Sequence, residues 1–502
     1  MTPPSSSLFP RAARAATVVL NLLLLVAGAE SQPAQQPSQA PDPVEGTWLG
    51  TVTAPQGTAE IGFKFEPNAK GELNFALYFP LMNTFGAKFE VPVARHGDVY
   101  TEPVLKSELK LRGSTLTGTF GPGKLPVTLT RSGDFASAPA APHFPAGPVP
   151  LWTVPLGSYT WAAPVVADGV VYVGAKDGKF HAVRAADGTE AWTWAGPSRI
   201  DGRAIVDGDR LCFVDGHNDL VCLNRADGTL RWRVPLYDEK LAGKPLPDNP
   251  TFNRRTATPL AVGGTIYCGS ADGGLYALDA ATGARRWRHE SGAPIFSGIA
   301  LVGADTLAFG TMDGSVVLLN GRTEQETLRG HTGGGVVTTP VVSGHTVLVG
   351  SRDYFLYGLN ATDGSVAWKF SYWFSWVEST GVLTDGLFYV GASDYRRVSA
   401  FDPATGRAAW GTDVRGLDWG TPLVVGDTIY IGTVAQNVPG TAIEHTGGIM
   451  ALDRHTGAVK WQFLATKPEA NGFGGYAGSL ATDGHRVFAA GFDGNLVAFP
   501  ID

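Results

Sequence analysis

Two carboxylate side chains, Glu378 and Asp418, are the candidates for catalysis in this chain. Both fall in expected loops next to tryptophans, where a carboxylate can serve as the general base of a hydrolase or lyase. The sequence contains no Walker loop, no His-Glu-x-x-His and no Gly-x-Ser-x-Gly motif, and its 10 histidines lack the spacing of a zinc site. No metal site is predicted, and the sequence favours a protein that is not an enzyme while leaving an enzymatic function open.

Aromatic and arginine side chains gather in the same kind of loop and predict a recognition surface. Such side chains provide a large contact area and directional hydrogen bonds at a small entropic cost. In two turns, Asp353-Tyr354 and Asp394-Tyr395, tyrosine stands where glycine is expected, which costs conformational energy or changes the turn type. The predicted ligand- or partner-binding residues are Tyr159, Trp161, Arg199, Arg254, Arg255, Tyr354, Trp373, Trp376, Glu378, Tyr395, Arg396, Asp418, Trp419 and Tyr476. The alternative interpretation is that the aromatic rings fill the central funnel of a wide ring.

These loops belong to a sequence repeat of about 40 residues that begins at Leu151. In the first copy, Ala162–Val166, Val170–Gly174, Lys179–Arg184 and Thr189–Trp194 are short β-rich runs. Asp-Gly pairs separate them, and such pairs tolerate the positive φ angles of tight hairpins. Four strands per repeat is the pattern of one β-propeller blade.

A tryptophan marks the outer strand of most copies and sets the expected number of blades. A large flat ring in each blade can brace its neighbour, so these residues are interpreted as structural. They are Trp152, Trp192, Trp232, Trp287, Trp368, Trp410 and Trp461, with a degenerate copy near Thr327, which gives eight outer strands. The last copy stops after its third strand at Phe499, whereas Leu151–Val154 has the sequence of an isolated fourth strand. Pairing these two ends would close the ring and remove its exposed edges.

The sequence ahead of the repeat divides into three further parts. Residues 1–29 are expected to be a signal peptide, because Arg11 and Arg14 precede an apolar run that ends in Ala27-Gly28-Ala29. Residues 44–132 alternate apolar and polar side chains between turn residues, which predicts a small antiparallel β-barrel or sandwich. The Pro-rich stretches 30–43 and 133–149 are expected linkers, and 150–502 is the expected propeller. An uncleaved membrane anchor is the alternative for the first segment; no other transmembrane span is predicted.

Charge and cysteine content exclude two classes of protein, those that bind nucleic acid and those held together by a disulfide scaffold. A formal net charge of -7 and a pI near 5.8 exclude the basic patch that nucleic-acid binding requires. Three cysteines are too few for a disulfide scaffold. Cys212 and Cys222 would face each other across a hairpin, so a cross-strand disulfide and two buried thiols both remain open, and Cys268 is left unpaired.

Three units carry a family resemblance: Ala277-x-Asp279-x-x-Thr282-Gly283-x-x-x-Trp287, and the equivalent units that end at Trp410 and Trp461. They resemble the tryptophan-docking motif of the pyrroloquinoline-quinone-like (PQQ-like) repeats of the quinoprotein alcohol dehydrogenase-like superfamily. The resemblance implies an eight-bladed propeller. One branch of the superfamily comprises quinone-dependent dehydrogenases, which use adjacent cysteines and a calcium site; this sequence has no adjacent cysteines. The other branch comprises non-enzymatic propellers such as that of the outer-membrane β-barrel assembly lipoprotein, whose lipid-bearing cysteine after the signal is absent here.

The sequence therefore predicts an all-β, exported, non-catalytic propeller, closed by an N-terminal outer strand and preceded by the small β-domain. It is expected to be a monomer in the periplasm or outside the cell, and to bind or scaffold an unknown protein or carbohydrate through the aromatic and arginine-rich loops. The alternative is a PQQ- and calcium-dependent dehydrogenase of alcohols or sugars, to whose cofactor site Glu378, Asp418 and Trp376 would contribute.

Overall fold

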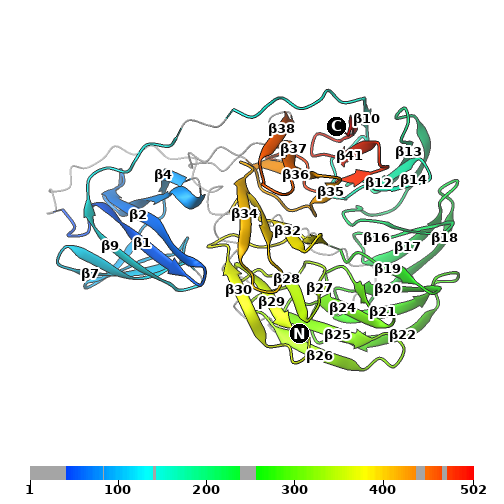
Figure 1. The fold of residues 1–502 in the computed structure, drawn as a ribbon, viewed down its shortest axis with the longest axis horizontal. Helices are drawn as coiled ribbons and strands as arrows, with labels where there is room; N and C mark the ends of the chain where they lie inside the picture. The colour runs from blue at the N-terminus through cyan, green and yellow to red at the C-terminus, as the bar shows by residue number, and fades with distance from the viewer. Residues whose placement is uncertain are drawn as a thin grey trace, which may run out of the picture.

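The computed structural model describes residues 41–82, 84–121, 123–139, 143–237, 256–436, 447–465 and 472–501. The chain is all-β: a nine-stranded sheet comes first and a ring of eight smaller sheets follows (Figure 1). This arrangement confirms the expected eight-bladed propeller with a small β-domain ahead of it. The expected signal peptide, together with Arg254 and Arg255, lies outside the described residues. In the part of the chain that is described, no helix has the length and apolarity needed to cross a membrane.

The N-terminal sheet owes its core to the alternation of its strands. In β9, Leu125, Val127 and Leu129 are buried while the residues between them are exposed, and the buried side inside the curled sheet is rich in aromatic rings such as those of Trp48 and Phe63. The strands are paired in the order β4-β3-β2-β1-β9-β8-β7-β6-β5. Their bounds are β1 (Gly46–Ala54), β2 (Gly57–Pro67), β3 (Leu73–Phe79), the 3-10 helix η3 (Pro80–Met82), β4 (Thr84–Phe89), β5 (Ala94–His96), β6 (Val99–Glu102), β7 (Ser107–Arg112), β8 (Thr115–Phe120) and β9 (Leu125–Ser132).

Each blade of the propeller is an antiparallel meander whose first strand is innermost and whose fourth is outermost. Blades 1 to 4 consist of β11 (Val165–Ala167), β12 (Val170–Gly174), β13 (Lys179–Arg184) and β14 (Glu190–Ala195); β15 (Ile205–Asp207), β16 (Arg210–Val214), β17 (Asp219–Asn224) and β18 (Leu230–Pro235); β19 (Leu260–Val262), β20 (Thr265–Gly269), β21 (Gly274–Asp279) and β22 (Arg285–Glu290); and β23 (Ala300–Val302), β24 (Thr306–Gly310), β25 (Ser315–Asn320) and β26 (Glu326–His331). Blades 5 to 7 consist of β27 (Val341–Ser343), β28 (Thr346–Gly350), β29 (Phe355–Asn360) and β30 (Val366–Ser371); β31 (Val382–Thr384), β32 (Leu387–Gly391), β33 (Arg397–Phe401) and β34 (Ala408–Asp413); and β35 (Leu423–Val425), β36 (Thr428–Gln436), β37 (Gly448–Asp453) and β38 (Val459–Leu464), with β39 (Phe473–Gly475) paired to β36.

Blade 8 joins the two ends of the repeat array. It contains β40 (Ala481–Thr482), β41 (Arg486–Ala490), β42 (Asn495–Pro500) and, as its outer strand, β10 (Trp152–Pro155). In the β10–β42 pair, Trp152 lies opposite Ala498. The strand ahead of the first complete repeat therefore closes the ring, as its sequence predicted.

The outer-strand tryptophans reach from one blade to the next. Trp192 of blade 1 donates its indole N–H to the carbonyl of Arg225 in blade 2 at 3.0 Å. Its ring also lies where a Cβ at Gly228 would come within 2.5 Å, and Gly228 has φ +72°. Glycine in that turn is therefore required twice, for its backbone angle and for the space under the ring. The same indole-to-carbonyl bond joins Trp152 to Ala185, Trp232 to Ala280, Trp368 to Pro403 and Trp410 to Arg454.

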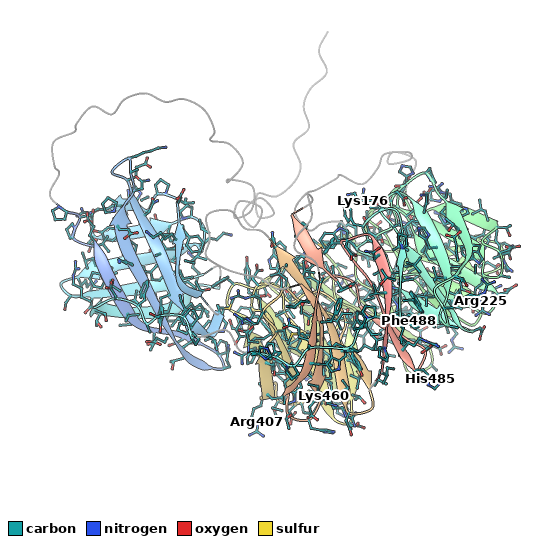
Figure 2. All side chains as sticks on the ribbon, turned by 90° about the horizontal axis from the view of Figure 1, so that it is seen from above. Lys176, Arg225, Arg407, Lys460, His485 and Phe488 are labelled. Atoms are coloured by element: carbon teal, nitrogen blue, oxygen red, sulfur yellow. A yellow bond between two sulfur atoms is a disulfide. The ribbon has the colours of Figure 1, made fainter. Side chains whose placement is uncertain are left out.

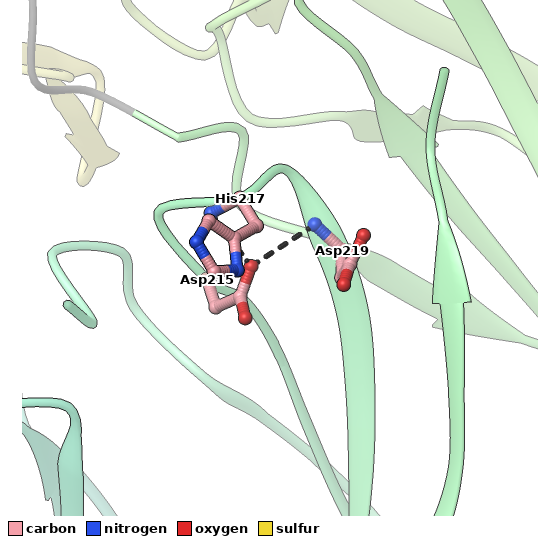
Figure 3. A group of neighbouring side chains, drawn as sticks. All are labelled: Asp215, His217 and Asp219. Atoms are coloured by element: carbon pink, nitrogen blue, oxygen red, sulfur yellow. Dashed lines mark hydrogen bonds between the residues drawn. The ribbon is translucent and has the colours of Figure 1, made fainter. Parts of the chain in front are cut away.

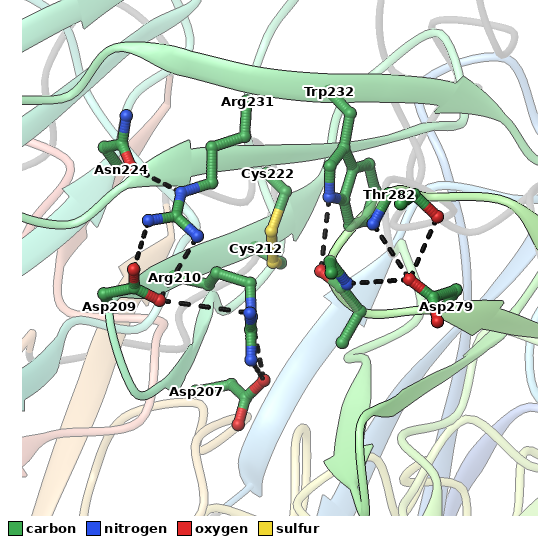
Figure 4. Close-up of a disulfide and its surroundings, with 12 residues drawn as sticks. Asp207, Asp209, Arg210, Cys212, Cys222, Asn224, Arg231, Trp232, Asp279 and Thr282 are labelled. Atoms are coloured by element: carbon green, nitrogen blue, oxygen red, sulfur yellow. Dashed lines mark hydrogen bonds and ion pairs between the residues drawn. A yellow bond between two sulfur atoms is a disulfide. The ribbon is translucent and has the colours of Figure 1, made fainter.

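Cys212 and Cys222 form a disulfide, which decides between the two interpretations that the sequence left open (Figure 4). The two residues are directly paired on β16 and β17. Cys268 in blade 3 is a free thiol and fully buried.

Thiol titration should separate the three cysteines. Burial raises the pKa of the Cys268 thiol far above its usual range, so native protein is expected to react with no equivalent of a thiol reagent. Unfolded protein without reductant should react with one equivalent, and unfolded, reduced protein with three. Three reactive thiols before reduction would contradict the disulfide.

Candidate functional site

We call one face of the propeller the loop face. It consists of the loops from the outer strand of one blade to the inner strand of the next, together with the turns between second and third strands. Figure 2 shows Lys176, from the β12–β13 turn, on this face, and Arg407 and His485 at the opposite face.

A central cavity of about 290 Å³ lies on the propeller axis, where the chain approaches each inner strand. Alternate residues of an extended chain point to the same side. Each blade therefore lines the cavity with two residues: one near the loop face, and a second that follows it by two positions in the sequence and lies deeper. We call these two sets the outer and inner rings of the cavity. The outer ring is Trp161, Asp201, Thr256, Phe296, Val337, Glu378, Trp419 and Ala477. The inner ring is Ala163, Arg203, Thr258, Gly298, Thr339, Thr380, Thr421 and Ser479.

Glu378 lies in the outer ring, and its carboxylate is bound by an arginine. Oε1 accepts hydrogen bonds from Nε and Nη2 of Arg352, both at 2.7 Å, and Glu378 is only 2% exposed. The Arg352 guanidinium also lies 4.8 Å from the ring centre of Trp376. A charge-assisted pair of this kind occupies the oxygen that a general base would use.

Asp418 does not face the cavity, because it lies in the seam between blades 6 and 7. A Cβ on Gly391 would come within 1.9 Å of its Oδ2. The equivalent glycines of other blades are covered by apolar side chains: Ile200 lies over Gly174, Ile295 over Gly269, Val336 over Gly310 and Val377 over Gly350. Asp418 is fully buried, and neither of its oxygens makes a hydrogen bond of good geometry among the described residues. Burial, only partly offset by the backbone of Gly420, raises the pKa of Asp418 well above its usual range.

Aromatic rings gather at one side of the cavity mouth. Trp161 stacks on Trp419 with ring centres 5.4 Å apart and contacts Phe492 at 4.8 Å and Phe473 at 5.7 Å. Tyr159 adds a contact to Phe492 at 6.2 Å. We call these five residues the rim cluster. They come from the loops that precede blades 1 and 7, from β39 and from the β41–β42 turn. Tyr159, Trp161 and Phe473 are only half-buried.

Trp373, Tyr395 and Arg396 lie apart from the cavity, at the contact with the N-terminal sheet. Trp373 is 3% exposed and meets Phe79 edge-on, with ring centres 5.2 Å apart. Arg396 is 2% exposed and donates a hydrogen bond to the carbonyl of Met82. These three side chains of the predicted recognition surface thus pack at the contact with the protein's own N-terminal domain.

The two unusual turns use their tyrosines differently. Tyr354 adopts φ +75°, close to the +85° of Gly178 at the same position of blade 1, so it accepts the conformational cost that glycine avoids. Its hydroxyl is hydrogen-bonded with Trp376. In blade 6 the turn is one residue longer, and Arg396 rather than Tyr395 has the left-handed angle, φ +51°.

Two further residues of the predicted binding set, Tyr476 and Arg199, contact other parts of the propeller. Tyr476 is 2% exposed in the seam between blades 7 and 8. Arg199 donates a hydrogen bond to Asp201 at 2.6 Å. Of the predicted set, the structure brings together Trp161, Glu378 and Trp419 at the cavity, with Tyr159 and Trp376 beside them.

Sequence reasoning missed Arg352, Arg203 and the hydroxyl side chains of the inner ring. Three of those hydroxyls precede a proline just before the inner strand, in Thr258-Pro259, Thr339-Pro340 and Thr421-Pro422. Alignment of the blades on this Thr-Pro pair would have revealed the inner ring.

One group of possible metal ligands occurs in the described part of the chain. Asp215, His217 and Asp219 of the β16–β17 turn place ligand atoms within 4.8 Å of one another (Figure 3). Arg233 already bonds the carboxylates of Asp215 and Asp219, each at 2.6 Å. The guanidinium supplies the positive charge that a metal ion would otherwise supply.

The residues of the cavity do not fit a calcium-bound quinone. The carboxylates among its described lining residues, Asp201 and Glu378, are each paired with an arginine. Asp418, which such a site would have used, points into a blade seam. The adjacent cysteines of the quinone enzymes are absent from the sequence.

Comparisons with known proteins confirm the resemblance to PQQ-like repeats. The family model PQQ_2, described as outer membrane protein assembly factor BamB, matches residues 149–270, 193–330, 271–373 and 325–502. The outer membrane protein assembly factor BamB of Burkholderia pseudomallei is 24% identical over 307 residues, which is 56% of this chain and 74% of that protein. The BamB protein of Nitrosomonas eutropha is 25% identical over 274 residues, 54% of this chain and 52% of that protein, so the match spans about half of that relative.

Among solved structures, the quinohemoprotein alcohol dehydrogenase of Comamonas testosteroni superposes with a TM-score of 0.52 at 15% identity. The superposition covers 70% of this chain and 76% of that one. At this identity the similarity shows the fold alone.

Proposed function

Since this chain belongs to the PQQ-repeat family described as outer membrane protein assembly factor BamB, we propose that it is an exported, non-catalytic propeller that binds a protein partner on its loop face. The rim cluster is the observation that carries this proposal. It joins segments next to three blades into one aromatic surface, in which Tyr159, Trp161 and Phe473 are half-exposed and Trp419 and Phe492 are buried. Aromatic side chains dominate the energetics of protein interfaces. The partner that we propose is a component of outer-membrane protein assembly, as the names of the relatives suggest.

The state of the carboxylates supports a binding function over catalysis. A catalytic carboxylate must reach a substrate proton within hydrogen-bonding distance. Glu378 is held by Arg352 on the cavity wall, and Asp418 is sealed between blades. Arg352 thus occupies Oε1 of Glu378, and Asp418 does not reach the cavity.

Site-specific photo-crosslinking in the producing cell tests the partner surface. A photoreactive residue at Tyr159, in the rim cluster, should give a discrete crosslinked protein, whereas the same residue at Arg407, on the opposite face, should give none. Trp161→Ala should reduce the Tyr159 adduct at least about tenfold, because truncating a central aromatic anchor costs about 2 kcal/mol or more. Equal adducts at both positions, or an adduct unaffected by Trp161→Ala, would contradict the proposal.

Calorimetric titration with PQQ, with and without calcium, tests the dehydrogenase alternative. Because the cavity carboxylates are paired with arginines, we expect no calcium-dependent binding. Tight calcium-dependent binding would make the protein an oxidoreductase and overturn the proposal of a non-catalytic propeller.

A further inference from the structure

Arg203 is the charged residue of the inner ring, and no carboxylate of the described residues forms an ion pair with it. It is exposed to the cavity, yet the protein surrounds it closely enough that burial alone lowers its pKa. Among the described residues, no hydrogen bond or ion pair involves its guanidinium. A recess that carries unbalanced positive charge attracts anions.

The other charges around the cavity are already matched. Asp201 of the outer ring accepts a hydrogen bond from Arg199, and Glu378 accepts two from Arg352. Both of these carboxylates therefore lie beside their own arginine. Among the described residues of the cavity, Arg203 is the charge that remains unbalanced.

Hydroxyl groups stand on the same ring as Arg203 and can donate to an anion. Five of the eight inner-ring residues carry a hydroxyl group: Thr258, Thr339, Thr380, Thr421 and Ser479. An arginine and hydroxyl donors that line one cavity can together bind the oxygens of a carboxylate or phosphate.

The outer ring offers a different surface. Trp161, Phe296 and Trp419 present aromatic rings to the cavity, and aromatic walls favour the flat face of an aromatic or sugar ring. The volume of about 290 Å³ lies at the lower end of the range of ligand sites. A ligand that fills both rings is therefore a small molecule with one anionic end.

We propose that the central cavity binds a small organic oxyanion, whose carboxylate or phosphate group lies against Arg203 and the inner-ring hydroxyls and whose ring packs against the outer-ring aromatic side chains. This ligand needs no metal ion and differs from the protein partner proposed for the loop face. Its binding is read separately from the crosslinking of the rim cluster, so either proposal can fail alone.

Titration of the full mature chain with matched charged and neutral probes tests the cavity. Phenyl phosphate, benzoate and glucuronate are the charged probes; benzamide and glucose are the neutral counterparts of the last two. Calorimetry and the fluorescence of Trp161 and Trp419, which line the cavity, are the two readouts. We expect saturable binding of at least one charged probe and binding at least about tenfold weaker for its neutral counterpart. Phenyl phosphate against benzoate shows which of the two oxyanions the cavity prefers.

Variants of Arg203 link the binding to the proposed site. Arg203→Met should reduce affinity for the charged probe at least about tenfold, and Arg203→Lys should retain part of it. The matched control is Arg322→Met, because Arg322 has a side chain that is 76% exposed and pairs with Asp305 outside the cavity. Bound anion should raise the melting temperature of the parent protein and of the control but not of Arg203→Met. Equal binding of charged and neutral probes, unchanged affinity in Arg203→Met, or no binding of any charged probe at millimolar concentration would overturn the proposal.

Discussion

Replacement of Trp373 by alanine is expected to lower the free energy of unfolding by about 3–5 kcal/mol, the usual loss when a buried tryptophan is truncated. Trp373 is 3% exposed and packs edge-on against Phe79 at the end of β3. The adjacent Phe374 contacts Phe120 of β8 with ring centres 5.9 Å apart. The substitution therefore removes the centre of the contact between the propeller and the N-terminal sheet.

Polar contacts are poorly placed to compensate for that loss. Arg396 gives one hydrogen bond to the carbonyl of Met82, but its Nε and Nη1 atoms have no hydrogen-bond partner within the described ranges. Gln56 exchanges two hydrogen bonds with the backbone of Ser371, at 2.8 and 3.1 Å. Each such hydrogen bond contributes about 1 kcal/mol to the free energy of unfolding. The aromatic packing is thus the larger part of what holds the two bodies together.

Denaturant unfolding and small-angle scattering together check the prediction for Trp373→Ala. The N-terminal domain should separate from the propeller, and the radius of gyration should rise in native buffer. Trp194→Ala is the control, since Trp194 is half-buried against Phe213 in the first two blades and its loss should destabilise the propeller without releasing the domain. A Trp373→Ala protein that is less stable but has an unchanged radius would contradict this role of the interface.

The fold could be predicted because its local rules agree with one another. The Asp-Gly and Thr-Gly turns need positive φ, and the outer-strand tryptophan needs a glycine beneath it, so one pattern records both the hairpins and the contact between blades. The position of Gly228 under Trp192 shows both requirements at a single residue. The pairing of the isolated strand β10 with the last repeat could also be predicted, since a ring with an unpaired edge is unfavourable.

The role of the aromatic loops could not be predicted in the same way. Sequence showed that Trp373, Tyr395 and Arg396 stand in loops, but not what covers them. Their contacts, Phe79 and Met82, belong to the end of β3 and the short helix η3, where their sequence looks like an ordinary hydrophobic core. The contact between two domains is a long-range property that neither periodicity nor turn chemistry records.

Asp418 illustrates how one departure from a repeat can be misjudged. In the sequence alone, a carboxylate next to Trp419 resembles a catalytic group. Comparison with the other blades shows that it replaces the isoleucine or valine that covers a glycine in four other seams, as Val377 covers Gly350. Strand registers place Asp418 one residue away from the cavity-facing position, and a shift of one residue reverses the side to which a side chain points.

Asp418→Val is accordingly expected to stabilise the protein, by about 1–3 kcal/mol, because it replaces a buried carboxyl without a well-formed hydrogen bond by the kind of side chain used in equivalent seams. The gain should depend on pH. The pKa of Asp418 is raised in the folded state, so the folded protein binds the proton more tightly than the unfolded chain does. Stability of the parent protein should therefore fall as pH rises from the ordinary range of an aspartate through the raised folded pKa, and then level off.

The valine variant lacks this proton-linked loss, so its advantage over the parent should be smallest near pH 4 and largest near pH 8. Denaturant unfolding at both pH values measures the difference. Asp418→Asn, which cannot ionise but stays polar, should remove the pH dependence without the full gain in stability. The reciprocal change, Val377→Asp, should destabilise the seam between blades 5 and 6 and introduce the same fall with pH. If Asp418→Val were less stable than the parent at pH 8, the carboxylate would have to be making a favourable interaction in its charged form, and the seam would have to be a site adapted to hold that charge.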